Sequence, residues 1–407
     1  MNQRGFFFVL LGACLFSSFA MAGVNSKNNS GSDSLQGITH FLARLRYEDV
    51  AQGIQGAQGL TLRSRFSYKT PSYHFFSGLL EFENITAIPN DENYNSGSNQ
   101  QFDDLLIQDP VGTEVSRVWL AYDVSNTLIK FGRQKVSLNN ERLVGADSFR
   151  QNEQSFSGVS VLNQSLNLTR ISLAQLNSVQ GVGGKKNPLS HSEINAKLLN
   201  IQYRGILSSK LTFYGLWLKN HPLQTQWETN TYGSRFEGET GDEAFSIDYV
   251  FEYARQEDTG KNTLNYQANY SLMELDFGRR GYHIKLGREI LGADGDGFFV
   301  TPLASLHDFQ GENDQFVNQG LGNIHGGIKD QYAKFTYSYL KNLSFSTIYH
   351  DFKSSEPNGS GNLGHEWGVK VDYKHNKYQF IASYADYTKH NFGNDNKKVW
   401  LTAELSL

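Results

Sequence analysis

The sequence predicts an all-β protein: a transmembrane, antiparallel, up-and-down β-barrel of about eighteen strands, with sixteen as the alternative count. Three observations predict this fold class. Hydrophobic residues recur at every second position along most of the chain. The links between these segments alternate between short and long. There is also no apolar run long enough to form a membrane-spanning helix.

The alternation is clear from the first predicted strand onward. In "ITHFLARLRYEDV" (38–50), Phe41, Ala43 and Leu45 fall on one face, while Arg44 and Arg46 fall on the other. Successive side chains of a strand point to opposite faces, so a period of two indicates a strand with two different environments. Most such segments span 10–13 residues, which matches a tilted strand crossing a bilayer.

Short and long links alternate along the chain. Barrels of the bacterial outer membrane have short periplasmic turns and long extracellular loops, and a soluble sandwich has no reason for this sorting. We therefore predict the cell outer membrane as the location. The predicted short links include 71–72, 124–126 and 206–208, and the predicted long ones include 51–58, 87–112, 138–149 and 292–325.

The N-terminus has the features of a secretory leader. Arg4 precedes an apolar run that ends in Ala-Met-Ala, so residues 1–22 are predicted to be a signal peptide. A lipid-modified Cys14 is the alternative. We expect 23–37 to be a flexible N-terminal segment and 38–407 to form the barrel.

Composition excludes several classes of protein. The 37 Lys and Arg against 41 Asp and Glu give a formal net charge of −4, which argues against nucleic acid as a partner. Cys14 is the only cysteine, so neither disulfides nor a zinc-thiolate site is expected in the mature chain. We expect no metal and no cofactor, although Asp294 and Asp296 lie in a glycine-rich fragment that resembles part of a calcium loop.

No catalytic motif is visible, and we predict that the chain is not an enzyme. The alternatives are an adhesin and an outer-membrane barrel hydrolase. A hydrolase would need a histidine beside an aspartate at the rim, and the adjacent candidates are His307–Asp308 and His350–Asp351.

Cations interrupt the apolar face pattern in a regular way. In "LIKF", Ile129 and Phe131 are expected to face lipid and Lys130 to face the lumen, because a charge near the middle of the lipid face costs about 2–4 kcal/mol. Strict alternation would put Arg133 on the lipid face, so we expect a bulge at Gly132 to redirect it, as at Gly287–Arg288; the alternative is that the strand has left the lipid there. The predicted pore-lining, anion-binding residues are Arg44, Arg46, Arg63, Arg65, Arg117, Lys130, Arg133, Arg142, Arg150 and Arg288.

Two interpretations of these cations remain open. Arginine donates two parallel hydrogen bonds to a carboxylate, so a series of arginines in a lumen would form a multi-site path for anions. Alternatively, acidic side chains in the lumen neutralise them. The first interpretation predicts that the side chains of Arg44, Arg63, Arg117 and Lys130 are exposed to the lumen.

The link 292–325 contains "TPLASLHDFQ", which is too apolar to extend freely into water. We expect it to fold into the mouth of the barrel as a constriction loop through Leu303, Leu306 and Phe309.

Several phrases carry a family resemblance. "GTEVSRVWLAYD", "KFGRQKVSLNNERLVG", "SFRQNEQSFSGV" and "YADYTKHNFGNDNKKVWL" occur in this order. Together they resemble the alginate-export family of outer-membrane porins. The resemblance implies a monomeric barrel of about eighteen strands that passes small anionic solutes such as uronate saccharides, with a general non-selective porin as the alternative. Expected partners are small anionic or neutral solutes, outer-membrane lipid and lipopolysaccharide, whose phosphates Lys219, Lys261, Lys353 and Lys389 could meet.

Overall fold

The computed structural model describes residues 36–89, 94–187, 190–219, 225–242, 244–338, 340–356 and 361–407. The predicted signal peptide and most of the predicted flexible segment lie outside the described residues. Within the described residues, no helix is long and apolar enough to cross a membrane.

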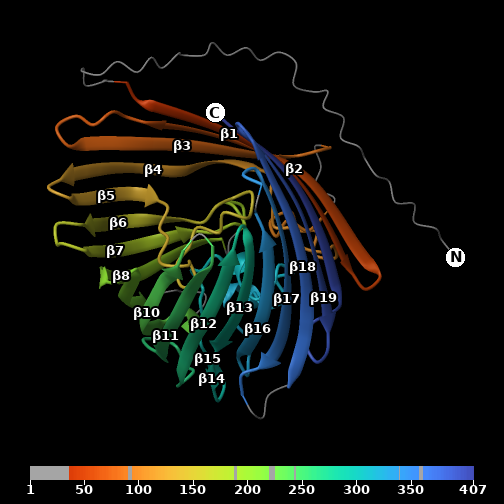
Figure 1. Ribbon diagram of the computed structural model, residues 1–407. Coiled ribbons are helices and arrows are strands. Elements are labelled where there is room, and N and C mark those ends of the chain that lie inside the picture. Colours follow the sequence, from red (N-terminus) through yellow and green to blue (C-terminus); the bar gives the residue numbers. More distant parts are fainter. Residues whose placement is uncertain are drawn as a thin grey trace. The chain divides into compact units, whose positions relative to one another are not determined.

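Eighteen antiparallel strands form one closed sheet, so the predicted fold class and strand number are confirmed. Each strand pairs with its neighbours along the chain, and β1 closes the barrel by pairing with β20 (Figure 1). The strands are β1 (Ile38–Gln52), β2 (Gln55–Lys69), β3 (Phe76–Ala87), β4 (Gly112–Val124), β5 (Thr127–Gln134), β6 (Ser155–Asn163), β7 (Thr169–Gln180), β8 (His191–Ile206), β9 (Ser209–Lys219), β10 (Thr229–Gly241), β11 (Ser246–Asp258), β12 (Gln267–Arg279), β13 (Tyr282–Leu291), β16 (Ile328–Tyr337), β17 (Leu343–Ser354), β18 (Asn362–His375), β19 (Tyr378–Lys389) and β20 (Asn396–Ser406).

The outer face of the barrel is apolar and uncovered. Phe131 is 65% exposed and Leu120, which lies opposite it on β4, is 54% exposed. A protein in water buries most such side chains in its core. A continuous exposed apolar face therefore indicates contact with lipid.

The links follow the predicted parity, with one correction. At one end of the barrel, the links at 125–126, 207–208, 280–281 and 376–377 have two residues each, while the opposite end carries 88–111, 135–154 and 292–327. The predicted long link at 51–58 is wrong. β1 and β2 stay paired up to Gln52 and Gln55, and only Gly53 and Ile54 form the turn.

Three long links fold into the barrel rather than away from it (Figure 1). Leu143, Val144 and Leu303 of two links are buried against inward-facing residues of β6 to β13, including Leu216 and Tyr270. This arrangement explains why inward positions of β8 and β9 are apolar: they contact folded loop rather than water.

Two further apolar clusters anchor these links. Phe316 of the link 292–327 packs against Phe352 and Tyr387 of the wall, and Tyr94 and Ile107 of the link 88–111 pack against Val50. The link 292–327 also contains the small strands β14 (Ala293–Asp294) and β15 (Gly297–Phe298) and the 3-10 turns η2 (Leu306–Asp308) and η3 (Asn318–Gly320); η1 (Thr225–Trp227) precedes β10.

Candidate permeation path

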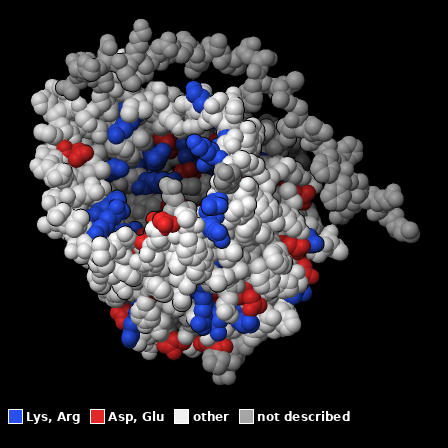
Figure 2. All heavy atoms as spheres, in the orientation of Figure 1, with Lys and Arg blue, Asp and Glu red and all other residues white. Residues whose placement is uncertain are grey.

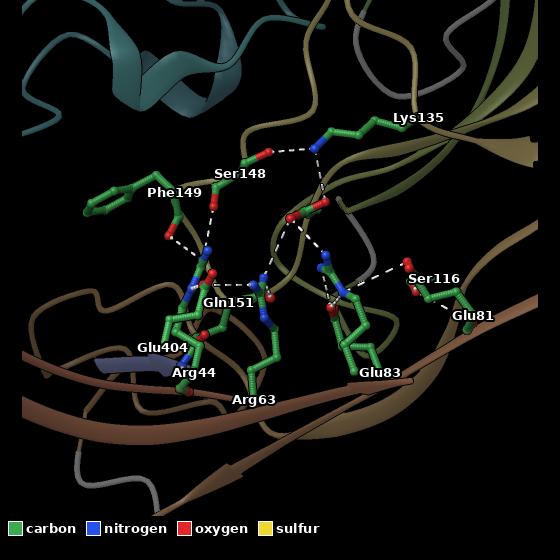
Figure 3. Close-up of polar contacts among 12 residues, drawn as sticks. Arg44, Arg63, Glu81, Glu83, Ser116, Lys135, Ser148, Phe149, Gln151 and Glu404 are labelled. Carbon is green, nitrogen blue, oxygen red and sulfur yellow. Dashed lines mark hydrogen bonds and ion pairs between the residues drawn. The ribbon is translucent and has the colours of Figure 1, made fainter. Parts of the chain in front are cut away.

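Four of the predicted arginines stand side by side on the inner face of β1 and β2. Arg44 lies directly opposite Arg63 in the strand register. Like charges directly opposite one another destabilise a sheet unless a counter-charge lies between them. Glu404 of β20 provides it, because its Oε2 lies 2.8 Å from Nε of Arg44 and 3.9 Å from a guanidinium nitrogen of Arg63 (Figure 3).

The link 135–154 supplies most of the other acceptors to this arginine group. Arg44 donates to the carbonyl of Ser148 at 3.1 Å, and Arg63 donates to the carbonyl of Gln151 at 3.0 Å (Figure 3). The carboxylate of Glu153 lies 2.9 Å from Arg65. The arginines therefore attach the link to the barrel wall, and the side chain of Arg63 is fully buried in the process.

The remaining inward arginines are also neutralised. Arg46 pairs with Glu48 and Asp109, and Arg117 pairs with Glu81. Two arginines of the link 135–154 pair with residues distant in sequence: Arg142 with Glu289 at 2.9 Å, and Arg150 with Glu48 at 3.1 Å and Asp314 at 2.7 Å. The interpretation that lumen acids neutralise the arginines matches this geometry. The expected lumen exposure of Arg63 is wrong, because it is enclosed between the wall and the link.

Lys130, Arg133 and Arg288 divide between the two faces. Lys130 points inward, with its ammonium 4.9 Å from the ring centre of Trp119. The expected bulges at Gly132 and Gly287 are wrong, since pairing through both glycines continues without a shift in register. Alternation then keeps both arginines on the outer face, near the strand ends; Arg133 donates to the carbonyl of Val115 at 2.9 Å. They are not placed to line the pore.

The link 292–327 enters the barrel, but the three apolar residues predicted to form the constriction lie in different environments. Leu303 is fully buried in the apolar cluster, and its carbonyl accepts a hydrogen bond from Gly145 of the link 135–154. Leu306 is only partly buried. Phe309 lines a cavity and lies 4.6 Å from the guanidinium of Arg142. Their role as a constriction stays a prediction.

The two links are held together by a buried charged group. Asp314 contacts His307 at 2.8 Å, Arg150 at 2.7 Å and Lys398 of β20 at 3.0 Å. Burial alone would raise the pKa of Asp314, but Lys398, His307 and Arg150 hold that pKa well below its ordinary value. Asp314 is therefore ionised and binds the link 292–327 to both the wall and the link 135–154.

Asp147 lies in the same region, but its pKa is shifted in the opposite direction from that of Asp314. Burial raises the pKa of Asp147 from 3.8 to about 6, because the nearby side chains of His307 and Arg150 only partly offset the loss of water. One of its carboxylate oxygens has no hydrogen-bond partner. Its charged form therefore opposes packing of the link 135–154.

We predict that Asp147→Asn stabilises the packed link 135–154 at pH 7 by about 3 kcal/mol, from the difference between the pKa of about 6 and the ordinary 3.8. In the wild type, packing should be strongest below pH 4 and weaken as the pH rises through about 6, where the buried carboxyl ionises. Hydrogen exchange of the backbone amides of 135–154 measures this. Asp103→Asn, in an exposed position, is the matched control. Equal pH dependence in Asp147→Asn and the wild type would contradict the assignment.

A cavity of about 580 Å³ lies between the two links and the wall formed by β12, β13, β16 to β20 and β1. Figure 2 shows Lys and Arg side chains gathered around a hollow in the molecule. Sequence reasoning missed three of the lysines that line this cavity: Lys285 of β13, Lys334 of β16 and Lys370 of β18. The sequence carries the signal for all three, since each lysine alternates with outward apolar residues as Lys130 does.

The lining of the cavity carries charges of both signs. Its lining contains the cations Arg44, Arg46, Lys285, Lys334 and Lys370 and the carboxylates Glu141, Glu274, Glu289, Asp308, Glu312, Asp330 and Glu404. Several of these are paired: Glu404 with Arg44, Glu274 with Lys285 at 3.5 Å, and Asp330 with His350 at 2.9 Å. Among the described residues, no carboxylate forms an ion pair with Lys334 or Lys370, so unneutralised lysines remain on the strand wall while Asp308 and Glu312 lie on the link.

The histidines considered for catalysis pair with aspartates other than their sequence neighbours. His307 contacts Asp314, and His350 contacts Asp330. Asp294 accepts a hydrogen bond from the backbone of Gln267, and Asp296 lies 3.4 Å from His325. Within the part of the chain that the structure describes, no group of three or more His, Cys, Asp or Glu side chains is arranged to hold a metal ion.

No family model and no curated protein matches this sequence, so the resemblance to the alginate-export family finds no support there. Solved structures do match. OpdK of Pseudomonas aeruginosa is 12% identical, with 91% of this chain and 98% of that chain covered and a TM-score of 0.71. OccAB2 of Acinetobacter baumannii is 14% identical, with 93% and 99% covered and a TM-score of 0.74. OccD3 (OpdP) of P. aeruginosa is 13% identical, with 91% of each chain covered and a TM-score of 0.70. The chain therefore shares its fold, a closed barrel of eighteen strands, with these structures, and OpdK is described as an outer-membrane protein.

Proposed function

We propose that the protein is an outer-membrane channel for the passive passage of small hydrophilic solutes, with a preference for solutes that carry a carboxylate. The closed barrel, its apolar outer face and its likeness to outer-membrane porins support the location and the channel function. Uronate saccharides, which the alginate-export resemblance suggests, are one such class of solute. Under this proposal the protein is a monomer and catalyses no reaction.

One observation carries the preference. Lys285 and Lys334 lie directly opposite one another on β13 and β16, and both line the cavity together with Lys370. Directly opposed like charges destabilise a sheet, and Glu274 lies within ion-pair distance of Lys285 only. A carboxylate entering the cavity would relieve this repulsion. In agreement with a solute of this chemistry, a solved structure of OpdK contains vanillate, an aromatic carboxylate.

A general porin with a neutralised wall is the second candidate. The ion pairs of Arg46, Arg65 and Arg150 favour it, because paired arginines offer little net charge to a passing anion. The two candidates differ in ion selectivity.

The test is the reversal potential of the purified full-length chain in a planar bilayer under a KCl gradient. Replacing Lys285, Lys334 and Lys370 together by Gln should shift the reversal potential toward cations, because three lumen charges are removed while polarity is kept. The shift should shrink in 1 M salt, where the Debye length is only about 3 Å.

The matched control replaces three exposed lysines outside the cavity, Lys341, Lys377 and Lys389, by Gln. This variant loses the same formal charge and should keep the wild-type reversal potential. An equal shift in both variants, or none in either, would leave the general porin as the better description.

A further inference from the structure

A groove of about 720 Å³ lies on the outer face of the barrel, away from the permeation path. It spans four neighbouring strands, β6 to β9. Two rows of outward-facing residues cross all four strands at this groove in the strand register. The row nearer the short-turn end consists of Val161, Leu173, Leu199 and Gly215. The row nearer the long-loop end consists of Val159, Gln175, Lys197 and Trp217.

Gly215, at the end of the first row, has no side chain, and this leaves room for the ring of Trp217 beside the groove. The ring of Trp217 leans over this glycine, so closely that a Cβ atom there would lie 2.6 Å from the ring. The indole nitrogen of Trp217 donates to the hydroxyl of Tyr232 at 2.9 Å, and the two rings meet edge to face. Trp217 thus forms a fixed wall at one side of an apolar floor made by Val161, Leu173 and Leu199.

Two lysines stand at the end of the groove that faces the long loops. Lys197 lies opposite Trp217, and Lys219 lies opposite Asn195 in the next outward-facing row. Both are exposed, and neither forms an ion pair with a carboxylate among the described residues. None of the described residues lining the groove is acidic. The nearest outward-facing acid on β8 is Glu193, beyond the mouth of the groove.

Unneutralised cations on the outer face of a membrane barrel are costly unless they meet an anion at the lipid surface. The long loops mark the extracellular end, so these two lysines lie on the side of the outer leaflet. The groove therefore combines an apolar floor at membrane depth with two ammonium groups toward the surface. This is the complement of a lipid with acyl chains and a phosphorylated headgroup.

We propose that this groove binds the lipid A portion of lipopolysaccharide. An acyl chain lies along Val161, Leu173 and Leu199 beside the ring of Trp217, and a headgroup phosphate is held between Lys197 and Lys219. The floor argues for a lipid rather than a free anion, because a soluble phosphate would leave the apolar row uncovered.

The test uses the full-length chain in detergent micelles, stripped of lipid, and titrated with bis-phosphorylated lipid A while native mass spectrometry counts bound lipid. The wild type should retain one lipid A molecule at low concentration. The variant Lys197→Gln with Lys219→Gln should bind about twenty-five-fold more weakly, since each lysine close to an anionic lipid surface contributes roughly a factor of five. The variant Lys341→Gln with Lys377→Gln, which removes two exposed lysines at the short-turn end of the barrel, should bind like the wild type.

Three further measurements separate the contribution of the lipid phosphates from that of the apolar floor. Lipid A without phosphates should bind the wild type as weakly as bis-phosphorylated lipid A binds the double variant. Leu173→Ser should weaken binding while keeping both lysines. Inorganic phosphate at equal concentration should not compete. Undiminished binding by the double variant, or full competition by inorganic phosphate, would overturn the proposal, provided that each variant shows the heat-dependent gel mobility of a folded barrel. Ion selectivity does not enter this test, so it stands apart from the proposed function.

Discussion

Excising residues 302–320 should raise single-channel conductance by at least about twofold, because the link 292–327 occupies the interior that a solute must cross. The backbone allows the excision: the amide of Thr301 donates to the carbonyl of Leu321 at 2.8 Å, so two glycines can join these residues. The deleted segment includes Leu303 and Phe309, one buried in the interior cluster and the other lining the cavity. Size selectivity should relax at the same time, with larger neutral sugars admitted.

The excision also removes three carboxylates, Asp308, Glu312 and Asp314, and a second variant tests the effect of the one that forms ion pairs with the wall and the other link. Asp314→Asn keeps the whole link but removes the carboxylate that contacts Arg150 and Lys398. It should change ion selectivity more than conductance. Heat-dependent gel mobility checks that each variant still forms a barrel. Unchanged conductance in a folded excision variant would show that the link lies outside the permeation path.

Glu153→Gln should loosen the link 135–154 by about 3 kcal/mol, the effect expected when one partner of a buried ion pair is removed. Glu153 lies 2.9 Å from Arg65, 3.2 Å from Lys135 and 3.7 Å from Arg63, and it is only 13% exposed. Burial would raise its pKa, but Arg65 and Lys135 hold that pKa at about 2. The charge is therefore present at any physiological pH, and its loss leaves three cations underneutralised.

Hydrogen exchange of the amides of 148–154 measures the loosening, and the reversal potential should move toward anions as the local charge becomes more positive. Lys135→Gln is the control within the same group. Its side chain is 35% exposed, so its loss should cost below about 1 kcal/mol. Equal protection of the link in the wild type and Glu153→Gln would mean that the ion pairs do not hold it.

The fold could be predicted from sequence because its cause is local. A strand between lipid and lumen must alternate at every second residue, and this period is visible in segments such as 38–50. The strand ends were less certain where the alternation continues into a turn or stops early. Pairing between β1 and β2 extends into the glycine-rich "GIQG" (53–56), whose first two residues form the turn. β5 ends at Gln134 rather than near 137, because the chain then turns into the interior.

The candidate site was less predictable, because its decisive contacts join distant parts of the chain. The single-strand pattern gave the inward direction of Arg44 and Arg63, but not that Glu404 and the carbonyl of Gln151 would meet them. Nor does any spacing in the sequence indicate that Arg150 meets Asp314. The alternation of a strand determines that an arginine points inward. Which carboxylates neutralise it depends on how the loops fold into the barrel.

The most direct test of the proposed channel compares the uptake of glucuronate and of glucose into liposomes containing the purified full-length chain. The two sugars have nearly the same size and differ by one carboxylate. If Lys285, Lys334 and Lys370 form a site for carboxylates in an open path, both sugars should enter faster than into empty liposomes, and glucuronate should enter faster than glucose at low salt. Glucose entering as fast as glucuronate or faster, or neither entering above the rate of empty liposomes, would contradict the account.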